Sequence, residues 1–143
     1  MAEGLLRHLA GDQFDVYSAG THPVGLNPGA VIAMQEMGVD VSAQRSKSMD
    51  ELFNQGFDYV ITVCDRAKES CPRWPHTGHL VHWSFDDPAA ATGSREEQHQ
   101  AFRTVRDQIK ARIEEFVFGR TVNVIEGRTP LSDTLCLGPR LIP

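Results

Sequence analysis

The sequence predicts an α/β domain built around a parallel β-sheet. Segments with the period of an amphipathic helix alternate with strand-like segments, and residues 57–64 (FDYVITVC) are rich in consecutive β-branched side chains. Such a run is typical of a strand that is covered on both faces, as in parallel sheets. The predicted order is helix, strand, helix, helix, strand, strand, helix.

Composition narrows the class of protein. The chain has 143 residues, which suits one domain, and its net charge of −5 argues against a nucleic-acid partner held through phosphates. No apolar segment is long enough to span a membrane, and no signal peptide is visible. We therefore expect a cytoplasmic protein. Its three cysteines, an odd number, are then more consistent with redox, catalytic or free thiols than with a disulfide framework.

The first third of the chain predicts two helices around a strand. A helix opens the chain without a capping residue before it, and its apolar positions recur at helical spacing: Ala2, Leu5, Leu6 and Leu9. Residues 14–19 alternate as a short strand that ends at the Gly20 turn. Asn27 then caps a helix that starts at Pro28 and ends at Gly38.

The middle of the chain predicts a short helix and two strands. Ser48 and Glu51 form a capping box for a helix over residues 49–55. The strand 57–64 follows, and after a loop a second strand over residues 79–85 leads into an Asp-Asp-Pro sequence.

The last predicted helix starts at a second capping box, Ser94 and Glu97, and runs to about Gly119. One stripe of this helix is apolar and comprises Phe102, Val105, Ile109, Ile113 and Phe116. Residues 119–143 contain several glycines and prolines and are expected to form an irregular tail, in which residues 121–126 alternate as a strand does.

Chemistry-bearing residues follow the strands, and ligands of parallel sheets bind at the carboxyl ends of the strands. Cys64 ends the strand 57–64, and Cys71 lies in the loop after it, so the pair suits a reversible disulfide. Two unrelated thiols are the alternative. A zinc site formed by the two cysteines with His76 and His79 is a weaker alternative, because the spacing of these residues matches no standard zinc-ligand pattern. We therefore expect no metal.

Asp87 is the other candidate catalytic group. Pro88 restricts Asp87 to extended backbone conformations and so limits where its carboxyl group points. A carboxyl group held in a cleft can serve as a general acid, although an ordinary Asp-Pro turn would also explain this pair.

These segments resemble a known family. SAGT (18–21), SKS (46–48), ITVCDRAKESCP (61–72) and HWSFDDP (82–88) are similar to motifs of the thioredoxin-coupled arsenate reductases, which have the three-layer low-molecular-weight protein tyrosine phosphatase fold. The resemblance covers residues 1–118, which we take as the domain, with residues 119–143 as the tail.

The resemblance implies reduction of arsenate to arsenite by a relay of three cysteines. The first cysteine belongs to a Cys-x5-Arg anion-binding loop and attacks arsenate. Cys64 matches the second cysteine and Cys71 the third, and their disulfide is reduced by thioredoxin, the expected protein partner. Asp87 matches the general acid.

The resemblance also implies residues that support the anion loop. Glu3 and Ser18 match positions that help to hold a potassium ion in some members. Lys47 stands where those members have Asp, and its ammonium group would replace the cation. We therefore expect no metal and no cofactor.

The chain departs from the family at one point. The family's first strand and anion loop are expected before Met1, and Cys64, Cys71 and Cys136 all lack an Arg six residues later. We expect a sheet without that strand and a chain that is inactive alone. In the family the strand lies between those predicted at residues 14–19 and 57–64. Either residues 121–126 fill the gap, or it stays open and the tail is disordered.

Three other functions stay open at this point. A hydrolase similar to the low-molecular-weight tyrosine phosphatases shares most of the motifs. A non-catalytic redox or interaction module would use only Cys64 and Cys71. A fragment without a function of its own is the third.

Overall fold

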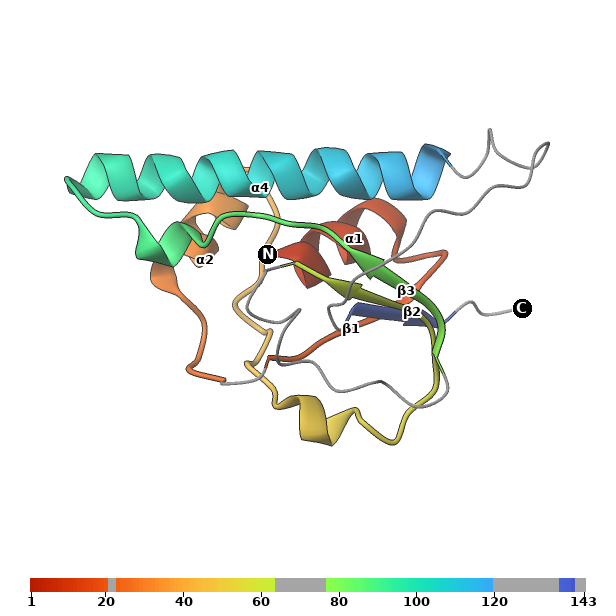
Figure 1. The fold of residues 1–143 in the computed structure, drawn as a ribbon. Helices are drawn as coiled ribbons and strands as arrows, with labels where there is room; N and C mark the ends of the chain where they lie inside the picture. The colour runs from red at the N-terminus through yellow and green to blue at the C-terminus, as the bar shows by residue number, and fades with distance from the viewer. Residues whose placement is uncertain (21–22, 64–76, 120–136, 141–143) are drawn as a thin grey trace.

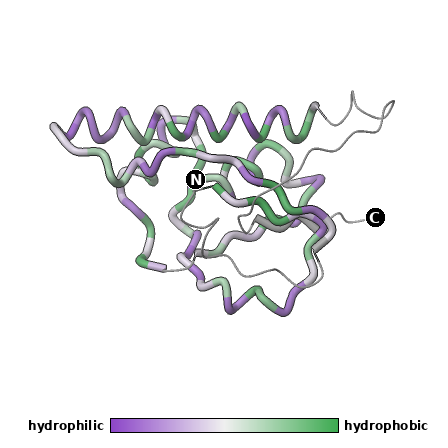
Figure 2. The backbone as a smooth tube through the Cα atoms, viewed as in Figure 1, coloured by the Kyte–Doolittle hydropathy of each residue, from purple (hydrophilic) through white to green (hydrophobic). Residues whose placement is uncertain are grey.

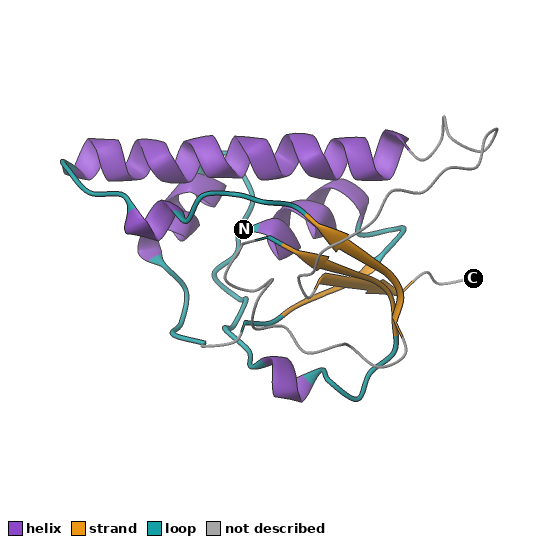
Figure 3. Ribbon diagram, viewed as in Figure 1, coloured by secondary structure: helices purple, strands orange, loops and turns teal. Residues whose placement is uncertain are grey.

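Helices α1 and α4 pack against one side of the strands, and α2 packs against α4 beside them (Figures 1 and 3). The computed structural model describes residues 1–20, 23–63, 77–119 and 137–140. The α-helices are α1 (Ala2–Ala10), α2 (Pro28–Gln35) and α4 (Arg95–Phe118), and the 3₁₀ turns are η1 (Met49–Glu51) and η2 (Pro88–Ala90). The strands are β1 (Asp15–Ser18), β2 (Phe57–Thr62), β3 (Thr77–His82) and β4 (Leu137–Arg140).

Local signals start the helices where the sequence predicts. The Asn27 side chain accepts a hydrogen bond from the Gly29 N–H, and Pro28 occupies the first turn of α2. Capping boxes are present at Ser48 and at Ser94, so both predictions are confirmed. Met1 occupies the N-cap position of α1 and makes no side-chain capping hydrogen bond.

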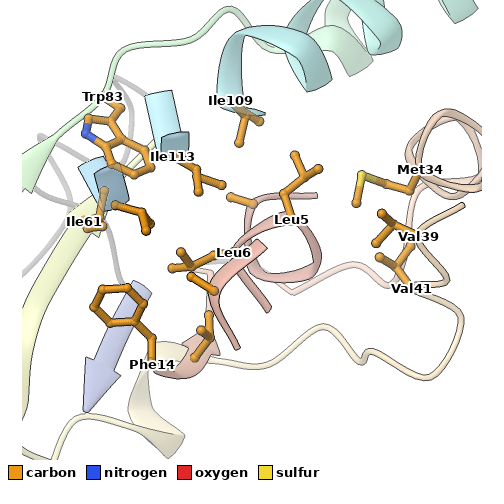
Figure 4. Close-up of a cluster of buried hydrophobic side chains, with 14 of the residues drawn as sticks. Leu5, Leu6, Phe14, Met34, Val39, Val41, Ile61, Trp83, Ile109 and Ile113 are labelled. Atoms are coloured by element: carbon orange, nitrogen blue, oxygen red, sulfur yellow. The ribbon is translucent and has the colours of Figure 1, made fainter. Parts of the chain in front are cut away.

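The main core lies between the helices and the sheet. Leu5 and Leu6 of α1 meet Ile109 and Ile113 of α4, and Ile61 of β2 closes the cluster from the sheet (Figure 4). Hydrophobic and hydrophilic residues alternate along α4 with the period of the helix, which turns one stripe toward this core (Figure 2). A second cluster of Leu52, Phe57 and Val60 covers the opposite face of the sheet beside η1.

An ionic network ties α2 to α4. The Arg103 guanidinium donates through Nε and Nη2 to the Glu36 carboxylate, at 2.9 and 2.8 Å, and Arg106 donates to the Ala33 carbonyl at 2.8 Å. The hydrogen bond from Arg103 is the main cause that lowers the pKa of the Glu36 carboxyl group. This network fixes α2 against α4 beside the core.

The described strands form two ladders of two strands each. β2 and β3 pair in parallel, which confirms the predicted parallel pairing, and β4 pairs antiparallel with β1. β4 also contacts β2, while β1 and β2 do not form a ladder with each other among the described residues, so β4 lies between them (Figure 1).

The tail differs from its prediction. Residues 137–140 form a strand where an irregular segment was expected, because the backbone of β1 offers hydrogen-bonding groups to a segment far away in sequence. The alternating segment 121–126 lies outside the described residues.

Several element boundaries also differ. The strand predicted over residues 79–85 runs over 77–82, because after Trp83, whose N–H still donates to the Thr62 carbonyl at 2.8 Å, the chain leaves the sheet. The helix predicted over 49–55 is a single 3₁₀ turn, too short to extend as an α-helix. α2 ends at Gln35, before a turn in which Gly38 takes a φ of 73°.

We predict that Ile113→Ala lowers the free energy of unfolding by about 2–5 kcal/mol, because Ile113 is fully buried between α4 and α1. Urea unfolding monitored by circular dichroism measures this change. Val24→Ala is the matched control, because Val24 is 94% exposed and should change stability by less than about 0.5 kcal/mol. A similar loss in both variants would contradict the packing described for α4.

Candidate functional site

A buried carboxylate organises the end of the molecule where α1 begins. Glu3 lies in the first turn of α1 and is only 3% exposed. The apolar face of α1 packs into the core through Leu5 and Leu6, which carries Glu3 below the surface. Because an isolated buried carboxylate is strongly disfavoured, its partners decide which segments gather around it.

Ser18, Arg7 and Lys47 surround this carboxylate. Arg7 Nη2 lies 2.9 Å from Glu3 Oε1, and Lys47 Nζ lies 3.5 Å from Glu3 Oε2. The Ser18 hydroxyl donates a hydrogen bond to Oε2. Arg7 also donates to the Val16 carbonyl at 2.5 Å and so joins α1 to β1. Two cations around one carboxylate leave the cluster with a formal charge of +1.

Backbone pairing brings Ser18 and Lys47 together. The Gly20 N–H donates to the Lys47 carbonyl at 2.9 Å, and the Met49 N–H donates to the Gly20 carbonyl at 3.2 Å, in a parallel bridge. The segment after β1 is thereby aligned with the segment before η1. The structure thus brings together Glu3, Ser18 and Lys47, the three residues that the resemblance groups as supports of the anion loop.

Asp87 lines a neighbouring pocket of about 290 Å³ at the start of α1. The pocket is also lined by Met1, Ala2, Val63, Phe85, Asp86, Pro88, Val105 and Ile109. It therefore joins the first residues of α1 to the segments that follow β2 and β3. Burial lowers the pKa of the Met1 amino group here, against the opposing effect of Glu3.

The backbone of Asp87 is extended, with φ −77° and ψ 106°, as its position before Pro88 predicts. Its Oδ1 accepts a hydrogen bond from the Ala89 N–H at 3.0 Å and caps η2. The carboxyl group is therefore oriented by local hydrogen bonding while it remains exposed at the pocket.

Cys64 and Cys71 lie outside the described residues, as does Cys136. Val63, the residue before Cys64, lines the Asp87 pocket. Among the described residues, no group of three histidine, cysteine or acidic side chains is arranged to hold a metal ion. The same part of the chain contains no helix with the length and apolar composition of a membrane span.

Sequence reasoning missed two interactions at this end of the sheet. Arg7 is a third partner of Glu3, and their four-residue spacing on one helix was a usable signal. The Thr62 hydroxyl and His82 Nδ1 are hydrogen-bonded at 2.5 Å across the last rung of the β2–β3 ladder. No local pattern indicates that contact, because it depends on the register of two strands.

We predict that Glu3→Gln lowers the free energy of unfolding by about 1–3 kcal/mol, because the Lys47 ammonium, 14% exposed, loses the charge that compensates it. Chemical unfolding at pH 7 measures the loss. Glu51→Gln is the matched control: it removes the charge from the exposed Arg45–Glu51 pair and should leave the unfolding midpoint nearly unchanged. Equal effects of the two substitutions would show that the Glu3 cluster is no more than a surface ion pair.

Comparison with known proteins shows which family the chain is similar to. The family model described as low molecular weight phosphotyrosine protein phosphatase matches residues 1–125. An arsenate reductase from Halalkalibacterium halodurans is 48% identical over 116 residues, which cover 81% of this chain and 84% of the relative. An arsenate reductase from Bacillus subtilis is 46% identical over 116 residues, which again cover 81% of this chain and 84% of the relative.

Solved structures that match this chain are likewise described as arsenate reductases. A structure described as an arsenate reductase in the phosphate binding state matches with a TM-score of 0.70 and 29% identity, over 82% of this chain and 86% of that one. One described as an arsenate reductase in reduced state matches with a TM-score of 0.68. The chain therefore belongs to the low-molecular-weight phosphotyrosine protein phosphatase family, in its arsenate reductase branch.

Proposed function

We propose that this chain carries the second half of an arsenate reductase relay and takes part in the reduction of arsenate to arsenite. The observation that supports this most directly is its identity of 46–48% with arsenate reductases over 116 residues. Reduction of As(V) to As(III) takes two electrons. Two thiols supply them when they join as one disulfide, and an arsenate oxygen leaves as water.

In this proposal the Cys64 thiolate attacks the sulfur of the adduct that arsenate forms with a first cysteine; a disulfide forms between these two cysteines, the S–As bond breaks, and arsenite leaves with the two electrons. The Cys71 thiolate then attacks Cys64 Sγ, and the first cysteine leaves as a thiolate. The resulting Cys64–Cys71 disulfide is reduced by thioredoxin, which returns the two electrons. A reducing cytoplasm suits this cycle. Asp87 serves as the general acid, and its place at the pocket beside Val63 supports that role.

The Glu3 cluster supports the anion-binding end of the site. Glu3, Ser18 and Lys47 meet beneath the first turn of α1, where the resemblance expects the anion loop to join the helix. Lys47 supplies a fixed positive charge next to Glu3, so this site needs no potassium ion. The net positive charge of the cluster, together with the helix N-terminus, favours a bound oxyanion.

The first cysteine is the component that the 143 residues do not supply, because the printed sequence contains no Cys-x5-Arg. We propose that the chain alone is therefore inactive toward arsenate. Removing a nucleophile and its anion loop together abolishes the chemistry, since the two act as a unit.

We predict no arsenite from the 143-residue chain supplied with thioredoxin, thioredoxin reductase and NADPH. A chimera that adds, before Met1, the residues of the Bacillus subtilis relative that precede its match should produce arsenite.

In that chimera Cys64→Ser and Cys71→Ser should reduce turnover to background, and Asp87→Asn should lower turnover by roughly 10²–10⁴-fold. Cys136→Ser is the matched control and should retain activity. Arsenite from the unextended chain would refute the proposed inactivity.

A hydrolase is the second candidate, because the matching family model is that of a phosphatase. The same chimera distinguishes a hydrolase from an arsenate reductase. Hydrolysis of para-nitrophenyl phosphate that persists in Cys64→Ser and Cys71→Ser, without arsenite production in the parent chimera, would favour the hydrolase.

We also predict that the 143-residue chain forms a Cys64–Cys71 disulfide on mild oxidation and that thioredoxin reduces it. Peptide mapping of the oxidised Cys136→Ser chain identifies the bond, and thiol titration follows its reduction. Cys71→Ser in the same background should leave a free thiol at Cys64. If the oxidised chain contains no such bond, both the relay and a simple redox module fail for this pair.

A further inference from the structure

A second pocket lies between α1 and the segment that follows α2, and we call it the Asp40 pocket. Its volume is about 330 Å³, which is at the lower end of the range for sites that hold small organic molecules and is more than an inorganic ion needs. Its lining residues are Gly4, Arg7, His8, Gly38, Val39, Asp40, Ala43 and Gln44. The Asp40 pocket shares no lining residue with the Asp87 pocket.

Close packing fixes the two sides of the Asp40 pocket relative to each other. Gly4 is buried, and a Cβ atom at this position would lie 2.6 Å from Val41 Cγ1, so glycine lets α1 approach the facing segment closely. The facing segment is held by its own backbone, because the Gln44 N–H donates to the Val41 carbonyl at 3.0 Å and the Val39 N–H donates to the Met34 carbonyl at 3.1 Å. The pocket is therefore a preformed hollow between two packed segments.

The α1 side of the Asp40 pocket carries a positive charge. Arg7 lines this side, and its side chain is 49% exposed. Its Nη2 serves both the Glu3 carboxylate and the Val16 carbonyl, whereas no acceptor in the described part of the chain is bonded to its Nε or Nη1. Guanidinium N–H groups pair strongly with carboxylates, so Arg7 can bind a second carboxylate at the pocket.

The facing side of the Asp40 pocket carries a negative charge. The Asp40 carboxylate accepts a hydrogen bond from the Ser42 N–H at 2.8 Å, and this bond is the main cause that lowers the pKa of the Asp40 carboxyl group. The group is therefore ionised at neutral pH and held at the turn by Ser42. A carboxylate has about four acceptor sites, so Asp40 can also accept a hydrogen bond from a ligand.

Opposite charges on the two sides select the kind of ligand. A simple anion would be repelled by Asp40, and a simple cation would be repelled by Arg7. We propose that the Asp40 pocket binds a small organic zwitterion, an amino acid or a compound like it, whose carboxylate pairs with Arg7 and whose ammonium group pairs with Asp40. The side chains of His8 and Gln44 add hydrogen-bonding groups to the lining. This site does not depend on the proposed reduction of arsenate.

The probes are glycine and 4-aminobutyrate, which carry the same two charges at a short and at a long separation. Butyrate and butylammonium each carry one of the charges and serve as matched compounds. Two-dimensional ¹H–¹⁵N NMR of the full chain follows each titration at constant ionic strength. We expect at least one zwitterion to cause saturable shifts centred on the amides of residues 38–44, with an affinity about tenfold or more above that of either single-charge compound.

Two substitutions test the two sides of the pocket. Asp40→Asn removes the charge but keeps a side-chain oxygen that can accept from the Ser42 N–H, and it should weaken binding of the zwitterion by about tenfold or more. Arg7→Gln should weaken it to a similar extent, and circular dichroism checks that this variant is folded. Asp12→Asn is the matched control, because Asp12 is exposed and lies outside the pocket, and it should leave the affinity unchanged.

Three results would overturn the proposal. The first is that neither zwitterion binds more tightly than butyrate and butylammonium. The second is that the shifts lie outside residues 4–8 and 38–44. The third is that Asp40→Asn and Asp12→Asn change the affinity equally, and this comparison decides the question even if Arg7→Gln does not fold.

Discussion

The burial of the Glu3 carboxylate is the constraint on which the candidate site depends. α1 must turn its apolar face into the core, and this places Glu3 below the surface with only 3% exposure. A carboxylate in that position needs charged and hydrogen-bonding partners, because desolvation without them is costly. Arg7 comes from the same helix, whereas Ser18 and Lys47 come from separate segments that the cluster draws together.

The same arrangement links the site to the frame of the domain. Arg7 joins α1 to β1 through the Val16 carbonyl, and the bridge between Gly20 and Ser48 aligns the segments that follow. The Asp87 pocket is lined by Met1 and Ala2, the two residues that precede Glu3. A reaction at this helix end would therefore have a fixed positive cluster and an oriented carboxyl group as neighbours.

β4 shows how a sheet can be completed by a segment that no local rule selects. Its Gly-Pro sequence disfavours a strand, yet the backbone groups of β1 and the contact with β2 impose one. Tertiary context overrides propensity here because the backbone groups of β1 need hydrogen-bond partners, and residues 137–140 supply them.

Elements with strong local signals could be predicted from the sequence. The caps at Asn27 and Ser94 and the β-branched residues of β2 act within a few positions of one another, so the chain alone determined where those elements begin. The family motifs likewise pointed to Glu3, Ser18, Lys47 and Asp87 before any geometry was known. Only the tertiary structure decided that the first three of these meet at one carboxylate, that Arg7 joins them and that residues 137–140 separate β1 from β2. Those contacts join segments distant in sequence, and they form only where burial in a shared core leaves polar groups no other partner.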